Sequence, residues 1–298
     1  MPKSKGRKTA HRAAGRTRGN PASGTARPSR TYDVGTLRIA PERLAGLLTD
    51  ESLAPDLMVE LLLPMRWIYD AEGTTANRCV DATTTLRHTY DFFGIEAHVR
   101  PVDLVVSDQN TGHMVQYGRP DPRWDDDVFS GHCVLHLPGS NRLIDPTVEQ
   151  YPEVRPFGLG PICGKVAAAQ ASPDQLATIR GGGLPPGTHI GVQRGHLMLL
   201  YTAVSDEYTD IVTTGPVVVA HEEQCRRSGM NLAAISLDLL RRKSSLTRAY
   251  RAPYPRLHAL LDAVGTAAME QDDDRDFRFA VPGFAGHPLG ARLDELIA

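Results

Sequence analysis

One short segment near the middle of the chain constrains the fold more than any other part of the sequence. Two runs of strand-forming residues, His132–Leu137 and Arg142–Asp145, are separated by the turn-forming residues Pro138–Asn141. Such an arrangement predicts a β-hairpin. The second strand should end where Pro146 begins, because proline cannot donate a hydrogen bond to a neighbouring strand.

The register of this hairpin predicts a polar contact. If Gly139 and Ser140 form the centre of the turn, Asp145 faces Val134 across the hairpin. His132 and Asp145 are then diagonal neighbours on one face, with backbones about 7–8 Å apart and side chains able to meet. The carboxylate would fix the tautomer of the imidazole and leave its other nitrogen for a second partner. A register slip of one residue would separate the two side chains.

A helix that begins with a cysteine is predicted before the hairpin. Asn77 is a suitable N-cap for a helix that starts at Arg78, and Gly94 is a suitable terminator. Apolar residues spaced by three and four form one inward face of this helix: Cys79, Ala82, Leu86, Tyr90 and Phe93. Cys79 therefore lies in the first turn, where unpaired N–H groups and the helix dipole favour a thiolate.

Further strands are predicted between and after these elements. Ile95–Val106 is rich in β-branched residues, and Pro101 within it suggests an edge strand or a bulge. A short strand is expected at Met114–Tyr117, followed by a loop over Gly118–Asp127. A second hairpin is expected at Thr188–Val204, with its turn at Arg194-Gly195.

The remaining elements are predicted to be helical. Two helices are expected within 36–71, helical periodicity dominates 216–269, and a short last helix is expected at 289–297. The predicted organisation is a disordered basic tail (1–33), a core of helices and strands (36–205) and a mostly helical region (206–298).

The amino-terminal tail carries an uneven share of the charge. Residues 1–30 hold nine of the 33 Lys and Arg residues, none of the 35 acidic residues, and no Leu, Ile, Val or aromatic residue. A segment of this composition cannot bury enough apolar surface to fold. Weak contact with a polyanion such as nucleic acid is one interpretation, and a solvated extension without a partner is the other.

Composition and cysteine spacing predict a cytoplasmic protein. No apolar run approaches the ~20 residues needed to cross a bilayer, and no secretory signal follows the basic amino terminus. The four cysteines are far apart and form no C-x-x-C pair, so neither a disulfide framework nor a zinc knuckle is indicated.

Several segments together resemble a known family. Asn77–Asp81 with Phe93–Ala97, then Gly131–Val134, then Leu143–Thr147 with Gln150, occur in the order and spacing of the transglutaminase-like branch of the papain-like thiol enzymes. The resemblance covers residues 55–151, about a third of the chain, and points to an uncharacterised bacterial branch of this cysteine enzyme superfamily.

The resemblance implies a fold and an activity. The fold would be α+β and papain-like, with the nucleophile helix packed on an antiparallel sheet, followed by the mostly helical carboxy-terminal region. Cys79 would be the nucleophile, His132 its base and Asp145 the group that orients the base. The activity would be thiol-dependent acyl transfer on a peptide, a protein or a small amide or ester, with no cofactor and no metal.

Two departures from the family pattern motivate an alternative function. Papain-like peptidases carry a Gln shortly before the cysteine to help hold the oxyanion, and here no Gln precedes Gln109. Asn77 and Trp67 are the candidate substitutes. The aromatic residue that commonly follows the family's Cys or His is replaced by Val80 and Cys133. The alternative is an inactive protein that keeps the fold and binds a protein or nucleic acid.

Other residues complete the hypotheses. Trp124, Thr147 and Gln150 are candidates for the rim of a substrate cleft. His113 is an alternative base, although no Asp lies at hairpin spacing from it. His136 is interpreted as a partly buried polar residue, because four residues along a strand span about 13 Å, too far for one zinc ion shared with His132. His221 and Cys225 are two metal-ligand types four residues apart on a predicted helix.

Overall fold

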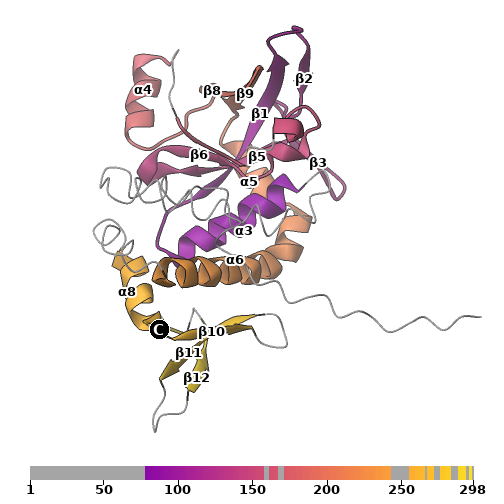
Figure 1. Ribbon diagram of the computed structural model, residues 1–298. Coiled ribbons are helices and arrows are strands. Elements are labelled where there is room, and N and C mark those ends of the chain that lie inside the picture. Colours follow the sequence, from indigo (N-terminus) through magenta and orange to yellow (C-terminus); the bar gives the residue numbers. More distant parts are fainter. Residues whose placement is uncertain are drawn as a thin grey trace, which may run out of the picture. The chain divides into compact units, whose positions relative to one another are not determined.

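A computed structural model describes residues 78–157, 161–166, 171–242, 255–265, 267–271, 276–282, 288–292 and 295–296 (Figure 1). The predicted tail at 1–33 and the two helices predicted within 36–71 lie outside the described residues, as do Trp67 and Asn77.

One antiparallel sheet of seven strands forms the centre of the fold. Its order is β7-β6-β5-β1-β9-β8, and β2 pairs with residues 105–107 of β1. The strands are β1 (His98–Asp108), β2 (Met114–Gln116), β5 (His132–Leu137), β6 (Arg142–Asp145), β7 (Ile162–Lys165), β8 (His189–Arg194) and β9 (Leu197–Ala203). An α+β architecture built on an antiparallel sheet is therefore confirmed. The hairpin predicted at 188–204 is formed by β8 and β9, with Gly195 in the turn at a φ of 59°.

The central hairpin has the predicted register. Leu135 pairs with Ile144 and Leu137 pairs with Arg142. The turn is a short 3-10 helix, η3 (Pro138–Ser140), which ends at Asn141 in the left-handed conformation with a φ of 48°. Asparagine tolerates this conformation better than most residues. The turn residues thus set the pairing that brings β6 beside β5.

Helix α3 (Cys79–Phe92) packs between the sheet and helix α6 (Pro216–Arg242), as Figure 1 shows. The predicted inward face is confirmed, since Cys79 and the four apolar residues that follow it on that face are all buried. The helix ends in a Schellman motif, because Gly94 N–H donates to Asp91 O and Ile95 N–H to Tyr90 O. Gly94 has the positive φ of 71° that this motif requires. At the other end Arg78 occupies the N-cap position without a side-chain cap.

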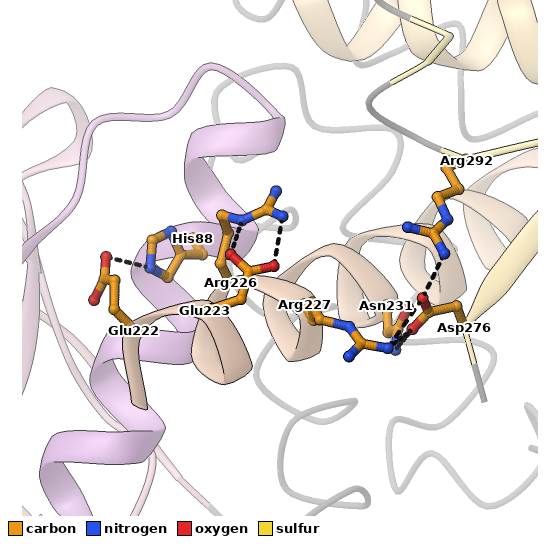
Figure 2. Close-up of polar contacts among 8 residues, drawn as sticks. All are labelled: His88, Glu222, Glu223, Arg226, Arg227, Asn231, Asp276 and Arg292. Carbon is orange, nitrogen blue, oxygen red and sulfur yellow. Dashed lines mark hydrogen bonds and ion pairs between the residues drawn. The ribbon is translucent and has the colours of Figure 1, made fainter. Parts of the chain in front are cut away.

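The contact between α3 and α6 is close at Gly229. Thr89 Oγ1 donates to the carbonyl oxygen of Gly229 at 3.2 Å. A Cβ at position 229 would lie 2.7 Å from the carbonyl oxygen of Thr85. The edge of the contact between α3 and α6 is polar. Glu222 on α6 lies 3.0 Å from His88 Nε2 (Figure 2), and it also accepts a hydrogen bond from Arg87 at 2.8 Å.

The carboxy-terminal region differs in part from the prediction. Helices α5 (Glu207–Thr213), α6 and α8 (Pro255–Val264) are present, but a three-stranded sheet follows: β10 (Ala268–Gln271), β11 (Phe277–Pro282) and β12 (Pro288–Ala291). The helix predicted at 289–297 is therefore wrong in its first part, where β12 pairs with β11. The periodicity of a short apolar run is compatible with both a helix and a strand. Here pairing with β11 makes the run a strand.

A buried carboxylate attaches this small sheet to α6. The Asp276 side chain is 2% exposed and lies 3.3 Å from Arg227 Nη2 and 3.1 Å from Arg292 Nη2 (Figure 2). A buried charge is tolerated where cations and hydrogen-bond donors surround it, and Asn231 adds a further donor at 3.5 Å.

Two smaller predictions are corrected. The loop expected over 118–127 contains β3 (Arg123–Asp125), which forms a hairpin with β4 (Val128–Ser130). Strand β1 is internal to the sheet rather than an edge strand. Pro101 pairs with Cys133 on one side, and pairing with β9 begins only at Val102, so the proline lies outside that second ladder.

The short 3-10 helices η4 (Val148–Gln150) and η5 (Arg155–Phe157) follow β6, and α4 (Pro173–Arg180) precedes β8. Ser172 caps α4 through a capping box with Gln175.

Replacing Gly229 with Ala should destabilise the fold. In an exposed helix interior this change stabilises by about 0.5–1 kcal/mol. Here the new methyl group would overlap the Thr85 carbonyl oxygen, because their separation would be 2.7 Å. We expect a loss of about 1–3 kcal/mol in the free energy of unfolding, measured by urea denaturation. Gln224→Ala, at an exposed position of the same helix, is the matched control and should change stability little; equal stability of the Gly229 variant would contradict the close packing.

Candidate active site

His132 and Asp145 meet as the hairpin register predicts. His132 Nε2 lies 2.7 Å from Asp145 Oδ2, and both side chains are fully buried. The carboxylate is an acceptor, so Nε2 carries a proton and the tautomer of the imidazole is fixed. The predicted contact is confirmed, whereas the catalytic roles of the two residues stay a prediction.

Asp145 accepts hydrogen bonds from three elements. Besides His132, its Oδ2 accepts from the hydroxyl of Tyr201 on β9 at 2.9 Å. Its Oδ1 accepts from the backbone N–H of Thr147 at 3.0 Å. Burial raises the pKa of Tyr201 well above its ordinary value, so this phenol stays protonated and donates. The carboxylate is therefore held by donors that replace the water it lost.

Thr147 and Gln150 support Asp145. Both side chains are buried. Gln150 Nε2 donates to Thr147 Oγ1 at 3.0 Å, and Thr147 Oγ1 lies 3.4 Å from Asp145 Oδ1. Their place on the rim of a substrate cleft stays a prediction; the chain that follows β6 in the short helix η4 holds both residues beside the carboxylate.

The second nitrogen of His132 has a partner that the sequence did not reveal. The hydroxyl of Tyr151 lies 2.7 Å from His132 Nδ1. The Tyr151 ring stacks on Tyr117 with centroids 3.8 Å apart, and the Tyr117 hydroxyl donates to Glu153. The imidazole is thus held at both nitrogens, by Asp145 on one side and by a tyrosine on the other.

Cys79 is the first residue of α3 and lies against the beginning of β5. The Cys79 sulfur interacts with the thiol of Cys133 and with the imidazole of His132, whose two ring nitrogens have their hydrogen-bond partners in Asp145 and Tyr151. The hydrogen bond from Cys133 lowers the pKa of Cys79 most, burial opposes it, and the hydrogen bond and charge of His132 lower it further, to about 5. Cys79 also lies where the free N–H groups of a helix start favour an anion.

His132 is held in its charged form by its neighbours. Burial lowers the pKa of His132, but the charge and hydrogen bond of Asp145, followed by the contact with Cys79, raise it to about 10. Between about pH 5 and pH 10 the pair is therefore a thiolate beside an imidazolium. Such a pair combines a nucleophile with a proton donor, which is what attack on a carbonyl group requires.

The remaining candidates lie elsewhere. Trp124 on β3 donates from Nε1 to the carbonyl oxygen of Ile211 at 3.0 Å, which ties this hairpin to α5; its place on a cleft rim stays a prediction. His113 is exposed in the turn between β1 and β2, so the alternative base is not the imidazole that meets Asp145. His136 is fully rather than partly buried, and burial lowers its pKa to about 4.

The described part of the chain contains neither a metal-binding cluster nor a helix able to span a membrane. There, no group of three or more His, Cys, Asp or Glu side chains is placed to hold a metal ion. His221 on α6 is exposed whereas Cys225 is buried, and these two residues belong to no such group. No helix among the described residues has both the length and the apolar character that crossing a bilayer requires.

Three residues of the site are not predicted by the sequence. Cys133 directly follows His132, and its one signal is that it stands where the family pattern leads one to expect an aromatic residue. Tyr151 follows Gln150 in a segment without periodicity, so nothing in the sequence gave its direction. Tyr201 lies on a strand that was predicted, but the partner of that strand in the sheet could not be read from the chain.

Comparisons with protein-family models, with curated proteins and with solved structures gave no match.

The charge state of the pair predicts how the alkylation of Cys79 depends on pH. A thiol with an ordinary pKa of about 8.5 should react more than about ten-fold faster at pH 8 than at pH 6.5. The pKa of Cys79 is about 5, so its alkylation rate by iodoacetamide should change less than about two-fold over this range. The rate is measured by peptide mass spectrometry, which separates Cys79 from the other cysteines.

Asp145→Asn should restore a pH dependence, because the carboxylate that holds the imidazolium is removed. The midpoint of the alkylation rate against pH should rise by about one pH unit or more, so the rates of wild type and variant are compared from below the wild-type midpoint of about pH 5 up to pH 8. Asp174→Asn, at an exposed position in the first turn of α4, is the matched control. A wild-type rate that climbs like that of an ordinary thiol would contradict the ion pair.

Proposed function

We propose that the protein is a thiol-dependent acyl-transfer enzyme of the transglutaminase-like kind, acting on an amide or ester. The observation that carries this proposal is the single imidazole that contacts both the Asp145 carboxylate and the Cys79 thiol. Helix α3, strand β5 and strand β6 supply one residue each, in the order that the family resemblance implies.

The proposed reaction begins with the Cys79 thiolate attacking the carbonyl carbon of the substrate. The π electrons move to the carbonyl oxygen, which becomes an oxyanion. His132 gives the proton on its Nδ1 to the leaving amine or alcohol as the tetrahedral intermediate collapses to a thioester. Asp145 keeps Nε2 protonated and holds the ring in place throughout.

The second half of the reaction releases the acyl group. Neutral His132 removes a proton from a water molecule, and the resulting hydroxide attacks the thioester. The carboxylic acid leaves, and the pair returns to thiolate and imidazolium. We favour water over an amine as the acceptor, since no amine-binding feature is visible among the described residues.

The oxyanion needs donors, and two described groups are available. The N–H of Cys79 is one of the first four of α3, which have no partner within the helix. Tyr151 is the other. When His132 is an imidazolium, its Nδ1–H donates to the Tyr151 oxygen, and the phenol proton is then free for another acceptor. Burial raises the pKa of Tyr151, so this proton is retained.

One observation favours a second function. Cys79 is 5% exposed and both His132 and Asp145 are fully buried. An inactive protein that retains the fold for interaction with a protein or nucleic acid would also tolerate a sealed pair. In that case the thiol would resist acylation by small esters as well as by large substrates.

Acylation of Cys79 separates the two functions. Incubation with p-nitrophenyl acetate should add one acetyl group to Cys79, detected by peptide mass spectrometry and removed by hydroxylamine. Cys79→Ala should lose the label completely, and His132→Ala should slow acylation at least about 100-fold. Cys163→Ala, at a partly exposed cysteine, should label like the wild type. Acetylation that persists in Cys79→Ala would refute the proposal, and no acetylation of a folded wild type would favour the interaction protein.

The choice between hydrolysis and transfer has its own measurement. Adding a primary alkylamine during turnover should leave the rate of carboxylic acid release unchanged if water is the acceptor. An amide product that accumulates at the expense of the acid would instead identify the enzyme as a transferase.

A further inference from the structure

Two thiols share one buried cluster beside His132. Cys79 is the first residue of α3, and Cys133 is the second residue of β5. Both are buried, both are free cysteines, and the side chain of each hydrogen-bonds to the other. The reaction proposed above uses the sulfur of Cys79 but has no use for that of Cys133. A second nucleophile in contact with the first therefore needs an explanation.

We propose that Cys79 and Cys133 form a reversible disulfide when the protein meets a peroxide, so that the thiol site is switched off and protected by oxidation. The inference rests on the proposed function in one respect, that Cys79 is the reactive thiol. It assigns a chemical role to Cys133 and names a small hydroperoxide as the co-reactant.

The oxidation proceeds in two steps. The Cys79 thiolate attacks one peroxide oxygen, the O–O bond breaks, and His132 supplies the proton that turns the leaving oxygen into water. Cys79 becomes a sulfenic acid and His132 becomes neutral. The Cys133 sulfur then attacks the Cys79 sulfur, neutral His132 takes the Cys133 proton, and the sulfenic hydroxyl leaves with that proton as a second water. Two thiols are oxidised by two electrons, and one peroxide is reduced to two waters.

The order of the two steps follows from the charges. Cys79 is the anion of the pair, so it reacts first. Burial raises the pKa of Cys133, and the hydrogen bond and negative charge of Cys79 raise it further. Once Cys79 has become a neutral sulfenic acid, the effects of its charge disappear. Cys133 is therefore released as a nucleophile only after Cys79 has been oxidised.

The positions of the two residues favour closure of the bond. The sulfurs must move from hydrogen-bond contact to about 2.05 Å. Cys133 lies near the start of β5, where it pairs with Pro101 of β1, whereas Cys79 begins its helix and has helical neighbours on one side only. Closure of the disulfide therefore requires the first turn of α3 to move towards β5. The same movement removes the nucleophile from His132, so the disulfide form cannot be acylated.

The test uses the full-length protein and a small excess of hydrogen peroxide. After oxidation, remaining thiols are blocked and the protein is digested without reductant. We expect a cross-linked peptide that joins Cys79 to Cys133. Dithiothreitol should then restore most of the iodoacetamide labelling of Cys79. Detection of Cys79 as a sulfinic acid in the wild type, with Cys133 still a free thiol, would overturn the proposal.

Variants test the protective role. In Cys133→Ser, Cys79 should proceed to sulfinic and sulfonic acids, and the labelling restored by dithiothreitol should fall to less than about a tenth of the wild-type value. Cys133→Ala serves as a second variant, and circular dichroism checks that both are folded. Cys163→Ser is the matched control and should recover like the wild type. Full recovery of folded Cys133→Ser and Cys133→Ala would overturn the proposal.

Failure of this inference is distinguishable from failure of the proposed function. Acetylation of Cys79 is measured on untreated protein, without peroxide. A chain that is acetylated but forms no Cys79–Cys133 disulfide retains the proposed function and refutes the switch. A chain that forms the disulfide but is not acetylated retains the thiol pair and refutes the enzyme.

Discussion

The buried contact between His132 and Asp145 is the interaction on which the arrangement of the sheet depends. Removing a carboxylate from water costs several kcal/mol unless donors surround it. Here the donors come from β5, from β9 and from the turn after β6, so three parts of the chain must be in place together. A sheet with another strand order would leave Asp145 without the Tyr201 hydroxyl. The polar cluster therefore specifies the topology as well as the site, at a cost that the surrounding apolar core offsets.

Helix α3 converts this polar cluster into a thiol site. Its apolar face fixes the rotation of the helix, and that rotation decides where the sulfur of Cys79 points. Helix α6 covers α3, and the close approach at Gly229 determines how deeply α3 lies against the sheet. The position of one sulfur atom thus depends on packing between elements that are separated by well over a hundred residues in the sequence.

The burial of the site links its two proposed chemistries. Exclusion of water disfavours the charge on each group taken alone, but it strengthens the interactions of Cys79 with Cys133 and His132 and of His132 with Asp145, and these keep Cys79 reactive near neutral pH. A buried reactive thiolate is also a target for small oxidants, which enter where larger molecules do not. Cys133 stands where the resemblance leads one to expect an aromatic residue. In the proposed scheme it gives the oxidised nucleophile a partner within the protein, so the two proposed reactions would compete for the same sulfur.

The local geometry of the site follows from short stretches of the sequence. The turn residues Pro138–Asn141 set the hairpin register, and this register placed His132 beside Asp145 because hairpin neighbours are fixed by turn length. Helical spacing placed Cys79 at an inward first-turn position. Only the tertiary structure brought Tyr151 to Nδ1, Tyr201 to the carboxylate and Cys133 to the thiol, and only it turned the residues near 289 into a strand. These contacts depend on the order of the strands in the sheet and on the position of the helix on the sheet. Both are determined by the packing of the whole core, which short-range sequence patterns do not encode.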